Sequence, residues 1–195
     1  MMEPSEEHRL AVAKGTFFQN THKSWAGNDS KNYVTQIKQL VSKYNANSVL
    51  DYGCGKGFQY TNPIKDLKPF NERCGFESYY LYDPCVEQYK VPPLPNQKFD
   101  AIICLQVIKH IPNQDILWLK QLFERTATKF VLIGDFDPAI KQKPSKITNT
   151  DAVNRNVEWY HTAFRDWNSP AKLHWCWRRP QTDIALQDNK NIRLP

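Results

Sequence analysis

A glycine-rich turn is the feature of the sequence with the clearest chemical meaning. Residues 49–57 read Val-Leu-Asp-Tyr-Gly-Cys-Gly-Lys-Gly, so a short apolar run reaches Asp51 and is followed by glycine at positions 53, 55 and 57. Glycines allow the backbone to turn sharply into a helix, and they let a ligand approach closer than a Cβ atom would permit. The pattern predicts a ligand site at this turn, with a carboxylate beside it.

Two familiar phosphate-binding motifs do not match the turn. The dinucleotide fingerprint GxGxxG requires a glycine at position 58, where the chain has Phe58. A P-loop requires serine or threonine after its lysine, whereas Lys56 is followed by Gly57. The turn therefore lacks the usual signature of a site for a dinucleotide pyrophosphate or a nucleoside triphosphate.

Alternating helices and strands must position this turn. Apolar residues from Tyr33 to Tyr44 recur at spacings of three and four, which predicts an amphipathic helix, and Ser48–Tyr52 is expected as a buried strand. The other elements expected up to residue 135 are helices at Ser5–Lys14, Phe58–Ile64 and Ile116–Thr126, and strands at Tyr79–Tyr82, Ala101–Leu105 and Lys129–Gly134. Several of these strands are apolar on both faces, which favours a parallel sheet covered by helices on two sides.

The C-terminal part has a different pattern. Asp151 is a candidate cap for a helix that carries apolar residues at 153, 157, 160, 164 and 167. Apolar and more polar residues alternate over residues 173–178, which predicts a half-exposed strand that pairs antiparallel with residues 183–186. No boundary divides the chain after this point, so we predict a single domain over residues 30–195.

Residues 1–29 form a separate N-terminal segment in this interpretation. Trp25 lies in a polar stretch, and a side chain of this size needs cover. Two interpretations remain open: Trp25 packs onto the domain, or residues 15–29 act as a lid over a ligand.

The glycine turn and three later segments resemble the motifs of the class I S-adenosylmethionine-dependent methyltransferases, in the order of that family. Residues 51–57 resemble its first motif, an acidic residue followed by GxGxG, and Asp83 resembles the acidic residue that ends the second strand. Residues 99–112 resemble the fourth strand with the segment after it, and residues 129–134 resemble the fifth strand. The compact chain also resembles small stand-alone methyltransferases encoded by bacteriophages.

The resemblance implies an α/β fold of the Rossmann-like, doubly wound kind. In that family the sheet has seven mostly parallel strands in the order 3-2-1-4-5-7-6, with an antiparallel C-terminal strand. The interval from Asp83 to Phe99 is shorter than the helix and third strand that usually lie there. The adenine pocket wall that these elements normally supply is therefore expected to be reduced or replaced.

The resemblance also implies S-adenosyl-L-methionine as the cofactor. Asp83 would accept hydrogen bonds from both ribose hydroxyls, and Asp51 would lie near the methionyl amine. The other cofactor-binding residues implied by position are Gly53, Cys54, Gly55, Gly57, Leu105 and Gln106. For Asp51, a role at the N-terminus of the next helix stays open. Gln106 and Lys109 stand where the family commonly has Asp and Glu, so no carboxylate role is carried over to them.

The activity expected from the resemblance is methyl transfer to a small-molecule or polymer-linked acceptor. Such a reaction depends mainly on orientation, and a base helps where the acceptor is a hydroxyl or an amine. His110, after the fourth strand, and His161, in the C-terminal part, are the candidate catalytic bases. Packed or surface histidines are the alternative for both.

Composition and absent motifs limit the other functions. The chain has 26 Lys and Arg against 20 Asp and Glu, and this net charge of +6 permits a nucleic-acid partner. The (D/N)PP(Y/F) motif of amino-methyltransferases is absent, so nucleic-acid methylation would lie outside that class. A catalytically inactive interaction module is a further alternative.

The sequence also indicates whether the protein binds a metal and where it is located in the cell. The five cysteines include no CxxC pair and the histidines no HxxxH pair, which predicts reduced thiols and no metal site. No apolar run reaches 18 residues, and the first residues are acidic. We therefore expect a cytoplasmic protein without a membrane partner.

Overall fold

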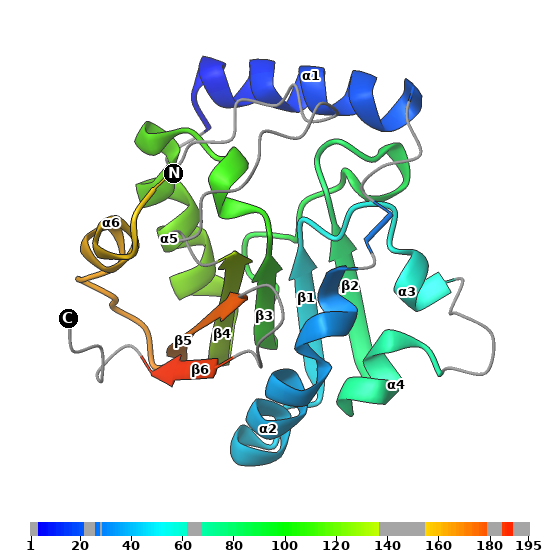
Figure 1. Ribbon diagram of the computed structural model, residues 1–195, viewed down its shortest axis with the longest axis vertical. Coiled ribbons are helices and arrows are strands. Elements are labelled where there is room, and N and C mark those ends of the chain that lie inside the picture. The colour runs from blue at the N-terminus through cyan, green and yellow to red at the C-terminus, as the bar shows by residue number, and fades with distance from the viewer. Residues whose placement is uncertain are drawn as a thin grey trace.

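A single sheet with helices on both faces forms the centre of the molecule (Figure 1). The computed structural model describes residues 4–21, 26–27, 29–61, 68–136, 155–178 and 185–188. The helices are α1 (Glu6–Thr21), α2 (Val34–Tyr44), α3 (Phe58–Thr61), α4 (Phe70–Cys74), α5 (Ile116–Thr126) and α6 (Val157–Ala163). The strands are β1 (Ser48–Tyr52), β2 (Ser78–Tyr82), β3 (Phe99–Leu105), β4 (Ala127–Phe136), β5 (Lys172–Arg178) and β6 (Ala185–Asp188). Short 3-10 turns lie at Asp29–Tyr33, Glu87–Tyr89, Ile108–His110 and Asn113–Asp115.

The strand order is β2-β1-β3-β4-β5-β6. Strands β1 to β5 are parallel to their neighbours, and β6 pairs with β5 in the antiparallel direction. This parallel sheet with its flanking helices confirms the α/β, Rossmann-like fold class. The carboxyl ends of β1, β2 and β3 lie at one edge, which is where ligands bind in open sheets of this kind.

Two details differ from the expected seven-stranded sheet. The described residues contain six strands, and the stretch from Asp83 to Phe99 holds only the turn Glu87–Tyr89. This stretch is too short for a helix and a further strand. In addition, β5 lies parallel beside β4 and the antiparallel strand lies outside it, so the order 3-2-1-4-5-7-6 is not seen in this part of the chain.

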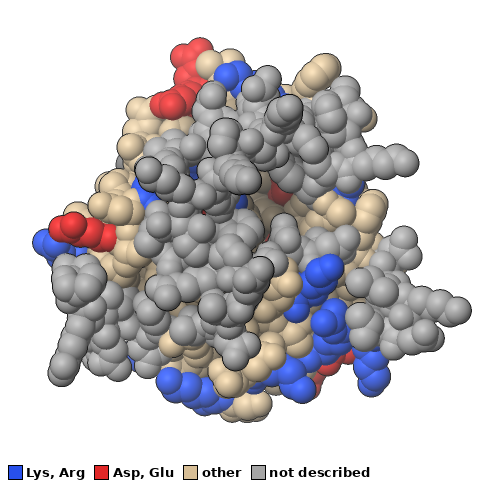
Figure 2. All heavy atoms as spheres, viewed as in Figure 1, with Lys and Arg blue, Asp and Glu red and all other residues tan. Residues whose placement is uncertain are grey.

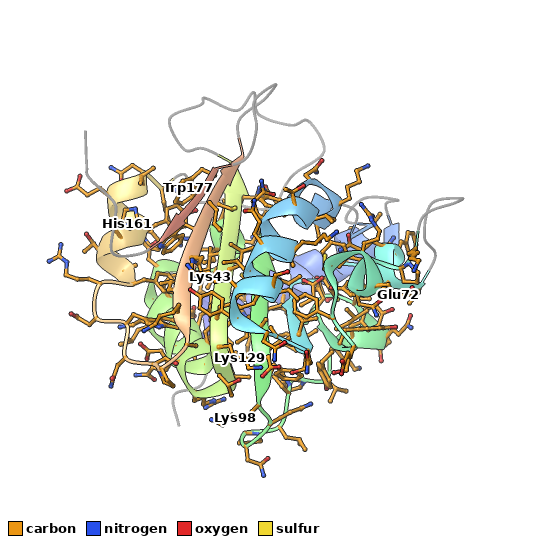
Figure 3. All side chains as sticks on the ribbon, turned by 90° about the horizontal axis from the view of Figure 1, so that it is seen from below. Lys43, Glu72, Lys98, Lys129, His161 and Trp177 are labelled. Atoms are coloured by element: carbon orange, nitrogen blue, oxygen red, sulfur yellow. The ribbon has the colours of Figure 1, made fainter. Side chains whose placement is uncertain are left out.

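Side chains pack on both faces of the sheet (Figure 3). On one face, Ile37 and Leu40 of α2 pack with Val49 and Ile103 of the strands. On the other face, Phe123 of α5 belongs to a cluster that includes alternate strand residues and α6. Burial on both faces explains the continuous apolar runs that the sequence shows in these strands.

Most of the expected elements are confirmed, but several are corrected. Helix α6 begins after Asn156, whose side chain accepts from the Trp159 N–H, and ends at Ala163, so it is shorter than predicted, and the expected cap Asp151 lies outside the described residues. The helix Ile116–Thr126 and the stripe of α2 have the predicted residues. Strand β5 is not half-exposed, because the His174 ring packs against Tyr44 and Phe130 and its Nε2 lies 3.0 Å from the Tyr44 hydroxyl. Helix α4 was not predicted, because its five residues are too short for a periodic pattern.

Helix α1 crosses the carboxyl end of the sheet (Figure 1). It extends to Thr21, beyond the Lys14 end that the sequence indicated. At its start, the Ser5 backbone N–H and hydroxyl donate to the two carboxylate oxygens of Asp115 at 2.7 and 2.6 Å. Further along, the Cys85 thiol lies 3.6 Å from the Val12 carbonyl oxygen. These contacts fix α1 above the ends of β2 and β3.

Candidate functional site

A cavity of about 490 Å³ lies between α1 and the carboxyl ends of β1, β2 and β3. Its volume is in the range of roughly 300 to 1,000 Å³ that is typical of small-molecule sites. The lining includes His8 and residues 10–15 of α1, residues 52–55, 83–85, 105–107 and 110–112, and Ser30. Residues 53–55 of the glycine turn therefore form part of the cavity wall.

The glycine turn takes a backbone shape that other residues rarely adopt. Gly53 and Gly57 have φ angles of +82° and +61°. A Cβ atom at Gly53 would lie 2.1 Å from Cγ2 of Val107. The N–H groups of Gly53 and Cys54 both donate to the Tyr82 carbonyl oxygen, at 2.7 and 3.2 Å, which ties the turn to the end of β2. Gly53 is required for both its conformation and its close contact with Val107.

Asp83 presents a fixed carboxylate to the cavity. Its Oδ2 accepts from the Gly55 N–H at 2.9 Å and its Oδ1 accepts from the Cys85 N–H at 2.8 Å. The side chain is only 8% exposed, and burial raises its pKa while these two backbone donors lower it. Each carboxylate oxygen has a second lone pair. The group is therefore positioned to accept hydrogen bonds from a ligand that carries two hydroxyls.

A comparison with known families identifies the chain. A family model described as a methyltransferase domain matches residues 25–187, which include the glycine turn, Asp83 and the segment after β3. The chain belongs to this methyltransferase family. No curated protein matches the chain. Helix α1 precedes the matched residues, yet it lines the cavity.

Asp51 and Gly57 are the two predicted cofactor contacts of this methyltransferase that do not line the cavity, whereas Gly53, Cys54, Gly55, Asp83, Leu105 and Gln106 do. Asp51 is 2% exposed, and its Oδ2 accepts from the Tyr60 hydroxyl at 2.9 Å. Burial raises the pKa of Asp51 to about 7; the Tyr60 hydrogen bond lowers it and the charge of Asp83 raises it further. At neutral pH the carboxyl is therefore close to its midpoint of titration.

Asp51 makes the stability of the methyltransferase depend on pH. Its folded-state pKa lies above the unfolded value of about 3.9, so the folded chain keeps a proton that the unfolded chain releases. This contribution is complete below about pH 4 and is lost as pH rises through about 7. We expect Asp51→Asn to remove it. Urea unfolding at pH 5 and pH 8 should show a larger decrease for the wild type than for the variant, and equal decreases would contradict the assignment.

Leu105 and Gln106 line the cavity at the end of β3. Gln106 has a φ angle of +65°, and its N–H donates to the Gly134 carbonyl oxygen at 2.6 Å. Its side-chain amide donates to the Tyr33 hydroxyl at 2.9 Å and accepts from Lys109 Nζ at 2.8 Å. Gln106 and Lys109, the two residues that differ from the family pattern, are therefore hydrogen-bonded to each other.

Asp135 is a buried carboxylate that the sequence did not single out. It lies near the end of β4, 3.5 Å from Lys109 Nζ, and accepts from the Tyr160 hydroxyl at 3.4 Å. The apolar run of β4 is followed by Asp135 in the sequence. Because ligand sites lie at the carboxyl ends of parallel strands, this position could have indicated Asp135 as a candidate site residue. Asp135 holds Lys109, and through it Gln106, against the cavity wall.

The two candidate histidines lie in different places. His110 lines the cavity, and burial together with the positive charge of Lys109 lowers its pKa to about 4. His161 lies on α6 at the flank of the molecule (Figure 3), with its ring 5.6 Å from that of Trp175. The structure therefore brings His110, but not His161, to the cavity with Asp83 and the glycine turn.

Further cavity residues were missed in the sequence. His8 and Tyr52 line the cavity, as does Gly27, whose Cβ would lie 2.2 Å from the Cys54 carbonyl oxygen. Of these three residues, only Gly27 could have been found from the sequence. A glycine in a polar stretch before a helix indicates a position where the backbone has a positive φ, and Gly27 has one. Trp25 lies outside the described residues.

Proposed function

We propose that this methyltransferase uses S-adenosyl-L-methionine and binds it in the cavity beneath α1. The observation that carries the proposal is the Asp83 carboxylate, which backbone N–H groups hold at the cavity wall. Two ribose hydroxyls match its remaining acceptor capacity. Residues 53–55 of the glycine turn line the cavity, and because Gly53 and Gly55 carry no side chain, the ligand chain can approach the backbone there.

The cofactor supplies an activated methyl group on a sulfonium sulfur. The protein residues then have three tasks: Asp83 holds the nucleoside end, the glycine turn supports the aminoacyl chain, and α1 keeps bulk water out. Fixing both reactants in this way contributes most of the acceleration expected for such a transfer. His110 lines the cavity and is largely neutral at pH 7, and its lowered pKa of about 4 makes it a weak base for an acceptor proton.

We propose a small-molecule acceptor in preference to a nucleic acid. The largest group of Lys and Arg visible in Figure 2 lies at the lower end of that view, where α2 lies, and away from α1. Lys98 and Lys129, labelled in Figure 3, stand at the starts of β3 and β4, whereas the cavity lies at the strand ends. These basic residues do not lead to the cavity.

We propose that the N-terminal segment is a lid, with α1 as its closing part. The two hydrogen bonds from Ser5 to Asp115 would hold this lid closed, because they join the start of α1 to the turn before α5. Asp115→Ala is expected to increase the dissociation rate of S-adenosylhomocysteine about tenfold, since it removes two hydrogen bonds from the closed form. Stopped-flow displacement measures this rate, and an unchanged rate would argue against a lid.

Calorimetric titration tests the proposed cofactor. S-adenosylmethionine and S-adenosylhomocysteine are expected to bind the full chain with micromolar affinity, and NAD, the control nucleotide, is not. Failure of both ligands to bind the folded protein would reject the proposal. None of the described helices has the length and hydrophobicity of a membrane span.

A further inference from the structure

The hydroxyl of Tyr52 and Nδ1 of His8 are buried polar atoms of cavity-lining residues, and neither has a hydrogen-bond partner among the described residues. Tyr52 is 1% exposed and His8 is 5% exposed, and both line the cavity. Buried polar groups in folded proteins are nearly always paired, because an unpaired one costs about 1 to 3 kcal/mol. A ligand in the cavity is the natural partner for both.

The two side chains both contact α5. The ring of Tyr52 packs edge-on against Phe123 at 5.2 Å, and the ring of His8 lies 5.6 Å from Trp118. Phe123 and Trp118 both belong to α5. Tyr52, from the sheet, and His8, from α1, therefore both pack against α5, and we call this pair the polar end of the cavity.

This polar end adjoins the carboxylate proposed to hold the ribose. Tyr52 is the register partner of Tyr82, their rings are 5.1 Å apart, and Asp83 follows Tyr82 directly. A nucleoside held by Asp83 thus has its base within a short distance of this end. The glycine turn, which supports the other part of the ligand, follows Tyr52 along the chain.

The hydrogen-bonding capacity of the pair fits a purine edge. Burial lowers the pKa of His8, and the charge of Asp115 opposes this shift, so the ring is neutral at pH 7. A neutral imidazole offers one donor and one acceptor nitrogen, and a tyrosine hydroxyl both donates and accepts. Adenine presents an amino donor at N6 beside an acceptor at N7. One residue can accept from N6 while the other donates to the ring nitrogen.

We propose that Tyr52 and His8 bind the hydrogen-bonding edge of the adenine base, with α1 supplying the wall that the short stretch between Asp83 and Phe99 lacks. The inference rests on the proposed cofactor. It makes α1, which precedes the matched methyltransferase domain, a specificity element of the site as well as its cover.

A thermodynamic cycle between side chain and ligand tests the pair. The variants are Tyr52→Phe and His8→Phe, which keep the rings against Phe123 and Trp118 but remove the polar atoms. The ligands are S-adenosylhomocysteine and its analogue with oxygen in place of the 6-amino group. Calorimetry should show that each variant binds S-adenosylhomocysteine about tenfold more weakly, and that the affinity ratio of the two ligands changes at least fivefold.

Tyr82→Phe is the matched control. It removes the same hydroxyl from the tyrosine that packs against Tyr52, but Tyr82 does not line the cavity. Its ligand ratio should equal that of the wild type. Unchanged ratios in folded Tyr52→Phe and His8→Phe would overturn the inference and leave the cofactor intact. Absence of S-adenosylhomocysteine binding in the wild type would reject the cofactor and the inference together.

Discussion

Asp83→Ala is expected to weaken the binding of S-adenosylhomocysteine by about 10- to 100-fold or more. Charge-assisted hydrogen bonds contribute roughly 1.5 to 3 kcal/mol each, and the carboxylate is proposed to accept two of them from the ribose. The substitution also frees the Gly55 and Cys85 N–H groups, which hold the glycine turn and the segment after β2. Both effects reduce affinity, and calorimetry measures their sum.

Asp100→Ala is the control for this experiment. Asp100 is also hydrogen-bonded, to the Asn47 N–H at 2.7 Å and Lys129 Nζ at 3.1 Å, but it lies at the start of β3 and far from the cavity. Its loss should reduce stability and leave the dissociation constant unchanged. An Asp83→Ala protein with native circular dichroism and wild-type affinity would refute the ribose assignment.

Gly53→Ala should destabilise the fold by about 2 to 5 kcal/mol and abolish measurable cofactor binding. The left-handed φ of +82° costs an alanine roughly 1 to 2 kcal/mol. The new Cβ would meet Cγ2 of Val107 at 2.1 Å and Cγ1 at 2.9 Å, an overpacking that typically costs about 1 to 3 kcal/mol. Urea unfolding of the variant measures the sum.

The double variant Gly53→Ala/Val107→Ala separates the two causes. Removing both methyl groups of Val107 relieves the clash but leaves the backbone strain. The double variant should therefore be more stable than Gly53→Ala and less stable than Val107→Ala. If adding Val107→Ala only lowered the stability of Gly53→Ala further, the close contact would not be the source of the effect.

Local sequence patterns were sufficient for the elements that build the turn. The spacing of apolar residues identified α2 and α5, and the run from Val49 into the glycines identified β1 with the turn. These features depend on neighbours within a few residues, which is the range that periodicity and glycine preferences report. The place of Asp83 could be predicted for a similar reason, because the residue that follows a parallel strand lies at the edge where the carboxyl ends of the strands meet.

The cover of the cavity depends on contacts between distant residues. Ser5 meets Asp115, and His8 meets Trp118, and neither pair has a local pattern that indicates the contact. The burial of β5 likewise requires Tyr44 of α2 to lie over His174, so alternation alone predicted half-exposure wrongly. Sequence analysis therefore located the glycine turn and the strand ends that line the cavity, but it did not predict that α1 covers the cavity.

The most direct measurement is a crystal structure of the full chain with S-adenosylhomocysteine. We predict ligand density in the cavity beneath α1, both ribose hydroxyls within hydrogen-bond distance of the Asp83 carboxylate, and the aminoacyl chain along the glycine turn. A ligand bound elsewhere, or one in the cavity whose ribose does not touch Asp83, would contradict the account.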